Sequence, residues 1–134
     1  MTTRRKFLAG ISTAAAVSLT SSFPALSAEN EKKLLVHHVF FWLKNPSSKE
    51  DLEKLLEGVN SLKKIETLLQ LKIGTPAATT KRDVIDDSYS ISLFTIFENI
   101  KSHDIYQDHP THQAFVKNYS PLWNKVVVYD SVDI

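Results

Sequence analysis

The fold of this chain is decided by residues 34–43, which read Leu34-Leu35-Val36-His37-His38-Val39-Phe40-Phe41-Trp42-Leu43. A run of ten residues rich in β-branched and aromatic side chains predicts a strand. Both of its faces are apolar: one carries Leu35, Val39, Phe41 and Leu43, and the other carries Leu34, Val36, Phe40 and Trp42 with His38. Such a strand needs a covering layer on each side. Helices of the same chain supply one layer, so we expect another subunit to supply the second.

An amphipathic helix follows this strand. It opens with a capping-box pattern of Ser47 and Glu50. Its apolar stripe recurs at steps of three and four residues and consists of Leu52, Leu55, Leu56, Val59, Leu62 and Ile65. A stripe of this kind, on an otherwise charged helix, predicts a helix laid on a sheet.

Three more strands and a second helix complete the chain. Alternating side chains predict strands at about 67–73, where Leu69, Leu71 and Ile73 share one face, and at 88–98. The second helix is capped by Ser102 and interrupted at Pro110, and the last strand covers 125–132. Between the second and third strands lies a polar segment, 75–87, which suggests a mobile connection or a lid.

The resulting order, β-α-β-β-α-β, is typical of the α+β ferredoxin-like fold, in which a four-stranded antiparallel sheet carries two helices on one face. The other face of the sheet remains apolar, because Phe40 and Trp42 lie on it. A soluble monomer rarely exposes an apolar patch of that size. We therefore expect a homodimer in which two such sheets face each other about a two-fold axis.

The first 28 residues predict an export signal of the twin-arginine type. Arg4, Arg5 and Lys6 precede a stretch without charge that runs to Ala28, where small residues favour cleavage. Hydroxyl side chains dilute this stretch, so a retained membrane anchor is the weaker alternative. We expect a short polar leader at 29–33, a domain at 34–134, no membrane association after cleavage, and a periplasmic or otherwise extracytoplasmic location.

Charge and cysteine content exclude several classes of protein. The chain carries 16 basic and 15 acidic side chains, and the loss of Arg4, Arg5 and Lys6 with the signal leaves a mildly acidic domain. Nucleic-acid binding is not expected, because it calls for a basic stripe that neutralises phosphates. The absence of cysteine excludes a disulfide framework and a thiol nucleophile.

A cluster of rings around a helix breaker marks the expected site. Residues 106–112 read Tyr106-Gln107-Asp108-His109-Pro110-Thr111-His112. Proline fixes its own φ and biases the preceding residue away from helical geometry, so His109 lies at a break in the helix. Side chains from the turns on either side of such a break can converge on one cavity.

Four segments together resemble the stress-responsive A/B barrel domain (Dabb) family over residues 34–133. They are Val36-His37-His38-Val39-Phe40-Phe41-Trp42-Leu43-Lys44, Leu71-Lys72-Ile73-Gly74, Tyr106-x-x-His109-Pro110-x-His112-x-x-Phe115 and Val127-Val128-Tyr129-Asp130. The resemblance implies a dimeric α/β barrel. It leaves the activity open, since most members have no assigned reaction and some plant members are stress-protective oligomers. In a plant polyketide cyclase of this family, the residues matching Tyr106 and His112 form the acid/base pair of an aldol-type ring closure without metal or organic cofactor.

The chemistry of these two side chains agrees with that role. An imidazole can accept and return a proton near neutral pH, and a phenol can donate a hydrogen bond to a developing oxyanion. We expect Tyr106 and His112 as candidate catalytic residues, with no cofactor and no metal. The residues expected to contact a small hydrophobic substrate are His38, Phe40, Trp42, Phe94, His109 and Phe115.

Other interpretations remain open from the sequence. Histidines beside Pro110 often cap helix ends, and His38 can simply hydrogen-bond within the protein. A metal site of His38, His109 and His112 is conceivable, because two histidines three residues apart can share an ion. Three kinds of protein therefore compete: a cofactor-free cyclase or isomerase, a module that binds a hydrophobic ligand, and a structural stress-protective oligomer.

Overall fold

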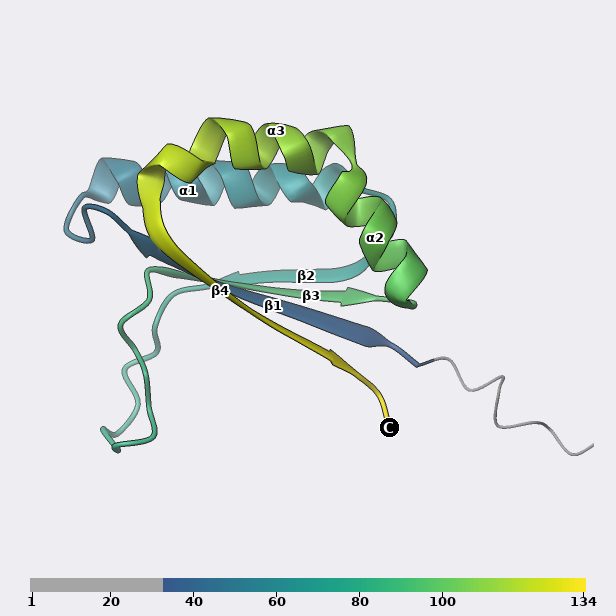
Figure 1. The fold of residues 1–134 in the computed structure, drawn as a ribbon. Helices are drawn as coiled ribbons and strands as arrows, with labels where there is room; N and C mark the ends of the chain where they lie inside the picture. The colour runs from purple at the N-terminus through teal and green to yellow at the C-terminus, as the bar shows by residue number, and fades with distance from the viewer. Residues whose placement is uncertain (1–32) are drawn as a thin grey trace, which may run out of the picture. The chain divides into compact units, whose positions relative to one another are not determined.

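The computed structural model describes residues 33–134 (Figure 1). The predicted signal at 1–28 and nearly all of the predicted leader lie outside these residues. The elements are β1 (Leu35–Leu43), α1 (Lys49–Ser61), β2 (Leu68–Gly74), β3 (Ile91–Phe97), α2 (Ile100–Asp108), α3 (Pro110–Tyr119) and β4 (Trp123–Val132). Short 3₁₀ turns at Leu62–Lys64 and Ser120–Leu122 follow α1 and α3. Within residues 33–134, no helix combines the length and apolar character that crossing a bilayer requires.

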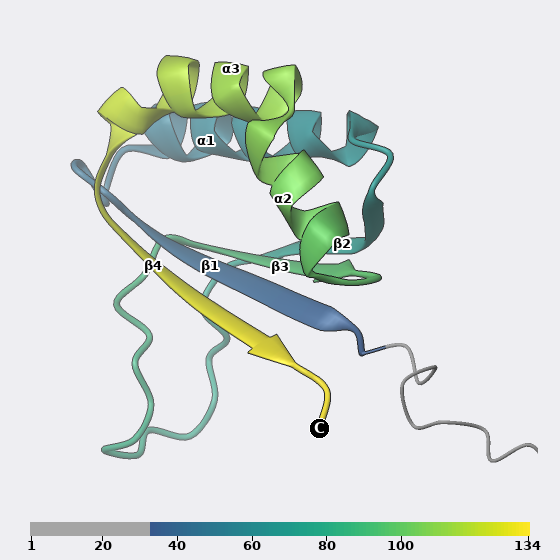
Figure 2. The same cartoon turned by 45° about the vertical axis from the view of Figure 1, so that its right-hand side comes forward.

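The four strands form one antiparallel sheet in the order β2-β3-β1-β4. Strand β1 lies in the middle, with Val39 opposite Leu93 of β3 on one side and Val128 of β4 on the other. All three helices lie on one face of the sheet (Figures 1 and 2). The predicted ferredoxin-like fold is confirmed, with its second helix divided into α2 and α3.

The core lies between the sheet and the helices. Along β1 every second side chain is buried, and these are Leu35, His37, Val39, Phe41 and Leu43. The predicted stripe of α1 packs against them through Leu55 and Val59, and Leu62 and Ile65 continue it beyond the end of the helix. The period-2 pattern of β1 and the period-3.6 pattern of α1 thus meet in one apolar layer.

Both predicted helix caps are displaced. Ser48, not Ser47, is the N-cap of α1, and its hydroxyl accepts a hydrogen bond of 3.1 Å from the backbone N–H of Asp51. The N-cap of α2 is Asn99, whose side-chain oxygen accepts from the N–H of Ser102 at 2.8 Å. In each case the capping residue is the last one with extended backbone angles, which lets its side chain reach back to the first turn.

Strand β2 differs from its predicted alternation. Its pairing with β3 shifts register between Leu68 and Gln70, so Leu69 is 59% exposed instead of sharing a face with Leu71 and Ile73. An extra residue in one of two paired strands interrupts the alternation of side chains between the two faces of the sheet at that point. Leu71 and Ile73 still pack against the core.

The face of the sheet opposite the helices is apolar and uncovered within one chain. Phe40 and Trp42 of β1 lie on it, together with Tyr129 of β4, which is 65% exposed. The segment between β2 and β3 extends away on this side (Figures 1 and 2). A hydrogen bond of 2.9 Å from Trp42 Nε1 to Ser88 Oγ ties the end of that segment to β1.

Candidate functional site

The helix break lies where the sequence predicts it. Helix α2 ends at Asp108, and His109, with φ −62° and ψ 136°, caps the start of α3 at Pro110. The Nδ1 atom of His109 accepts a hydrogen bond of 3.1 Å from the N–H of Thr111, and its Nε2 atom lies 3.6 Å from Glu66 Oε2. His109 is thus engaged as a helix cap and does not line the cavity described next.

Tyr106 and His112 lie on the two sides of this break and come together. Their ring centroids are 4.8 Å apart, and the centroid of Phe115 lies 6.2 Å from that of His112. All three side chains line a cavity of about 170 Å³ between the helices and the sheet. The remaining wall is mostly apolar, with Phe41 and Trp123 among its side chains. The sequence therefore predicted correctly that these two rings share a cavity.

The strand histidine at this cavity is His37. It is buried on the helix-facing side of β1, and its Nδ1 atom lies 2.6 Å from Asp130 Oδ1 and 3.2 Å from His103 Nε2. The side chain of Gln107 lies 3.5 Å from His37 Nε2, and Thr95 Oγ1 donates a hydrogen bond of 2.7 Å to the His37 carbonyl. Adjacent strands and α2 therefore position one polar cluster against the cavity.

Sequence reasoning missed the members of this polar cluster. His37 lies two and four residues before Val39 and Phe41 in β1, so the alternation alone places its side chain on the core face of the sheet. His103 and Gln107 are four residues apart on α2 and share one of its faces. No local signal identifies Asp130, which reaches His37 only through the β1–β4 register.

Four residues expected at the cavity lie on the opposite face of the sheet. Successive side chains of a strand point to opposite faces, so His38, Phe40 and Trp42 of β1 face away from the helices, as does Phe94 of β3. His38 Nε2 lies 2.8 Å from the hydroxyl of Ser92 on that face. The expectation that these four line the same cavity as Tyr106 is wrong. A metal site of His38, His109 and His112 is excluded for the same reason, because the sheet separates His38 from the other two.

Burial sets the protonation states of the two central rings. Tyr106 is 1% exposed, and desolvation raises its pKa far above the ordinary value of 10.0. Burial also lowers the pKa of His112 below 6.5, and the neighbouring His37 and His103 lower it further, whereas a hydrogen bond with the backbone of Gln107 raises it. At neutral pH the cavity therefore holds a protonated phenol beside a neutral imidazole.

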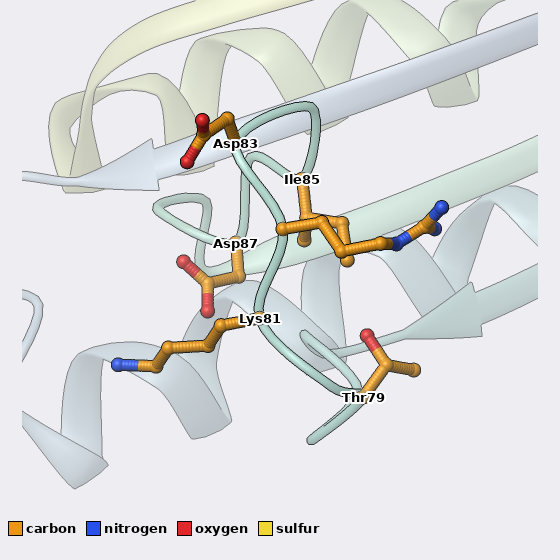
Figure 3. A pocket seen from close by; sticks show the side chains of 6 residues that line it. Thr79, Lys81, Asp83, Ile85 and Asp87 are labelled. Carbon is orange, nitrogen blue, oxygen red and sulfur yellow. The ribbon is translucent and has the colours of Figure 1, made fainter.

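A second hollow, of about 290 Å³, lies within the segment between β2 and β3. It is lined by Thr79, Lys81, Arg82, Asp83, Ile85 and Asp87, and Figure 3 shows Thr79 and Lys81 pointing in different directions from the loop. No residue of this segment lines the cavity at Tyr106. The suggestion that this segment is a mobile connection or a lid stays a prediction.

With this geometry established, comparison with known proteins identifies the family. The sequence pattern of the stress responsive A/B barrel domain, Dabb, matches residues 35–133. This chain belongs to the Dabb family. No curated protein matches it significantly.

Solved structures of similar fold include a Dabb family protein and an enzyme. A Dabb protein with a ferredoxin-like fold from Mesorhizobium loti is 24% identical, with a TM-score of 0.63 over 76% of this chain and 98% of that one. A hydroxynitrile lyase from Passiflora edulis is 19% identical, with a TM-score of 0.66 over 78% and 96%. A dimeric ferredoxin-like protein of unknown function from Thermobifida fusca is 16% identical, with a TM-score of 0.62 over 77% and 93%. At sequence identities of 16–24%, the structural similarity to these proteins establishes the fold of this chain and nothing more.

Proposed function

We propose that this Dabb domain protein is an exported enzyme that binds a small hydrophobic molecule in the cavity at Tyr106 and transfers protons on it with Tyr106 and His112. The observation that carries the proposal is the pairing of a neutral imidazole and a protonated phenol, 4.8 Å apart between ring centroids, in the wall of an apolar cavity. The hydroxynitrile lyase among the structural relatives supports it, because the same fold serves as an enzyme there.

The two rings have complementary chemical roles. A neutral His112 can take a proton from the carbon next to a substrate carbonyl, and Tyr106 can donate a hydrogen bond to the oxygen that becomes an enolate. The His112 imidazolium formed in this step can return the proton to another atom of the substrate, which completes an isomerisation. In a substrate with a second carbonyl group, the enolate carbon can instead attack that carbonyl carbon, and the imidazolium then protonates the resulting alkoxide, which completes an aldol-type closure. Every proton in this cycle is held by the substrate or by His112, so the cycle requires no cofactor.

The size and lining of the cavity limit the substrate. Its volume of about 170 Å³ is several times the share of one liquid water molecule, ~30 Å³. Phe41, Phe115 and Trp123 present aromatic surface to it. A flat or branched ligand of a few carbon atoms with one carbonyl group fits this volume and polarity.

The assembly that we propose is a homodimer formed through the open face of the sheet. Phe40, Trp42 and Tyr129 leave that face apolar, and several structural relatives are dimeric ferredoxin-like proteins. Because the cavity lies on the helix side of the sheet, pairing of the open faces leaves it accessible. The twin-arginine sequence at the N-terminus supports export of the folded protein.

Proton exchange tests the enzymatic part of this proposal. Purified protein is incubated in D₂O with a panel of small ketones and aldehydes, and deuterium uptake next to the carbonyl is followed by NMR. We expect uptake with the wild type, none above background with His112→Ala, and a rate lowered by about 10²–10³-fold with Tyr106→Phe, as for loss of one oxyanion donor. His109→Asn is the matched control, because asparagine retains the helix cap and His109 lies outside the cavity.

Native mass spectrometry of the same samples separates binding from turnover. A ligand that is retained by the wild type without any deuterium uptake would show a binding module and refute the acid/base role. Equal uptake by the wild type and His112→Ala would refute it as well.

A further inference from the structure

Three side chains from three different elements converge beside the cavity. They are His37 of β1, His103 of α2 and Asp130 of β4. One ligand atom from each of these residues lies within 4.8 Å of the other two. We infer that these three residues form a binding site for one divalent transition-metal ion. This inference goes beyond the proposed acid/base function and does not depend on it.

Hydrogen-bonding capacity at the cluster favours a cation. In its neutral form an imidazole carries one proton, so His37 Nδ1–H has a single hydrogen to place between Asp130 Oδ1 at 2.6 Å and His103 Nε2 at 3.2 Å. His103 Nδ1 lies 3.5 Å from Asp104 Oδ1, which favours the tautomer with the proton on Nδ1 and a lone pair on Nε2. Besides this imidazole proton, the side-chain amide of Gln107 faces the same lone pair at 3.3 Å. A divalent cation in place of the His37 proton receives a lone pair from each of the three residues.

The distances are close to those of a metal site. Ligand atoms bound at ~2.0–2.1 Å in a tetrahedral site lie about 3.3 Å from one another. The 3.2 Å between His37 Nδ1 and His103 Nε2 already meets this spacing. Asp130 has to move outward from its 2.6 Å to His37 while staying within reach of His103, and its side chain, 49% exposed on an edge strand, has room to do so.

Surrounding groups hold the two histidines in position. Asp104 beside His103 Nδ1 supplies the outer carboxylate that commonly orients a metal-binding histidine. The side-chain amide of Gln107 lies 3.5 Å from His37 Nε2 and 3.3 Å from His103 Nε2. His37 itself is buried in β1, where neighbouring strands pair with it on both sides.

The donor set selects the kind of ion. Two imidazole nitrogens and one carboxylate suit Zn²⁺, Co²⁺, Ni²⁺ or Fe²⁺, whereas Mg²⁺ and Ca²⁺ prefer oxygen ligands. Three protein ligands leave at least one position for water or for a ligand atom. Because His37 and Gln107 also line the cavity of about 170 Å³, that position would be reached from the cavity.

Metal titration of the full-length protein, purified without a histidine tag, tests the site. Residues 1–28 contain no histidine, cysteine, aspartate or glutamate, so the N-terminal segment adds no competing side chain of these types. Zn²⁺ binding is measured by isothermal titration calorimetry, and Co²⁺ binding by its visible absorption. We expect one ion per chain. Metal affinity should fall at least ~10-fold in both His103→Ala and Asp130→Asn, because even the loss of a group that only orients a metal ligand typically lowers affinity by that much. The control His109→Asn should bind as the wild type does.

The results of this titration decide the inference in every case. Failure of the wild type to bind, unchanged affinity in either cluster variant, or an equal loss in His109→Asn would overturn it. If circular dichroism shows that His103→Ala is unfolded, Asp130→Asn decides alone, because asparagine keeps an acceptor for His37 and preserves the side-chain shape. The titration contains no organic ligand, so its failure leaves the deuterium-exchange result unaffected, and the reverse also holds.

Discussion

Replacement of Gly58 by alanine probes the contact through which α1 supports α3. Gly58 is buried in α1, and a Cβ atom placed there would lie 2.7 Å from Cγ of the Tyr119 ring and 2.8 Å from both of its Cδ atoms. Carbon atoms at optimal separation are ~3.5–4.0 Å apart. Cγ is the root of the ring and not its flexible end, so Tyr119 cannot swing away freely. To relieve the overlap between the Cβ atom and the Tyr119 ring, α3, which carries His112 and Phe115, has to shift relative to α1.

Two opposing effects set the size of the change in stability. Overpacking a well-packed contact costs about 1–3 kcal/mol, and alanine in place of glycine inside a helix contributes about 1 kcal/mol of stability. We therefore expect Gly58→Ala to lower the free energy of unfolding by up to about 2 kcal/mol, with ~1 kcal/mol as the central value. For a domain of this size, a loss of 1 kcal/mol lowers the melting temperature by about 4–8 °C.

Urea denaturation of a small set of variants tests this reasoning. In a Tyr119→Ala background the clash is absent, so Gly58→Ala should raise stability by up to about 1 kcal/mol, which reverses the sign of the effect. Gly74→Ala is the control, because no atom lies within 4 Å of the Cβ placed there, and its effect should stay within about 0.5 kcal/mol. If Gly58→Ala is equally stabilising with and without the Tyr119 ring, α3 is not held by this contact and the reasoning fails.

Two further predictions concern pH and assembly. Burial lowers the pKa of His37 and His112 in the folded state below the unfolded value of 6.5, so the unfolded chain binds more protons between the two values. The free energy of unfolding should therefore be full above about pH 6.5 and fall as the pH drops through the folded pKa values, with a shallower fall in His112→Gln. A melting temperature that does not change with pH would contradict this. Phe40→Asp places a charge on the open face of the sheet, where burial of an unpaired charge costs several kcal/mol, so analytical ultracentrifugation should show dimerisation weakened by at least ~100-fold. Ile105→Asp, on the exposed surface of α2, should leave assembly unchanged, and equal dissociation of both variants would argue against that interface.

The Tyr106 to His112 motif shows how far local sequence predicts the site. Proline geometry fixed the helix break, and residues on either side of a break converge, so the contact between these two rings was predictable. His109 was less predictable, because its capping bond to Thr111 depends on where the new helix starts. The same uncertainty of one residue displaced the predicted cap of α1 from Ser47 to Ser48.

The sequence by itself determined the elements, their order and the existence of two apolar faces on β1, because alternation and helical periodicity are local properties of the chain. It also assigned Phe40 and Trp42 to the open face, but it did not determine on which side of the sheet the cavity at Tyr106 lies. Tertiary structure made that decision, because the helices that carry Tyr106 and His112 cover the face of His37, and thereby placed His37, not His38, at the cavity. It also brought Asp130 to His37 across 93 residues through the β1–β4 register, a contact that depends on strand pairing and not on any local pattern.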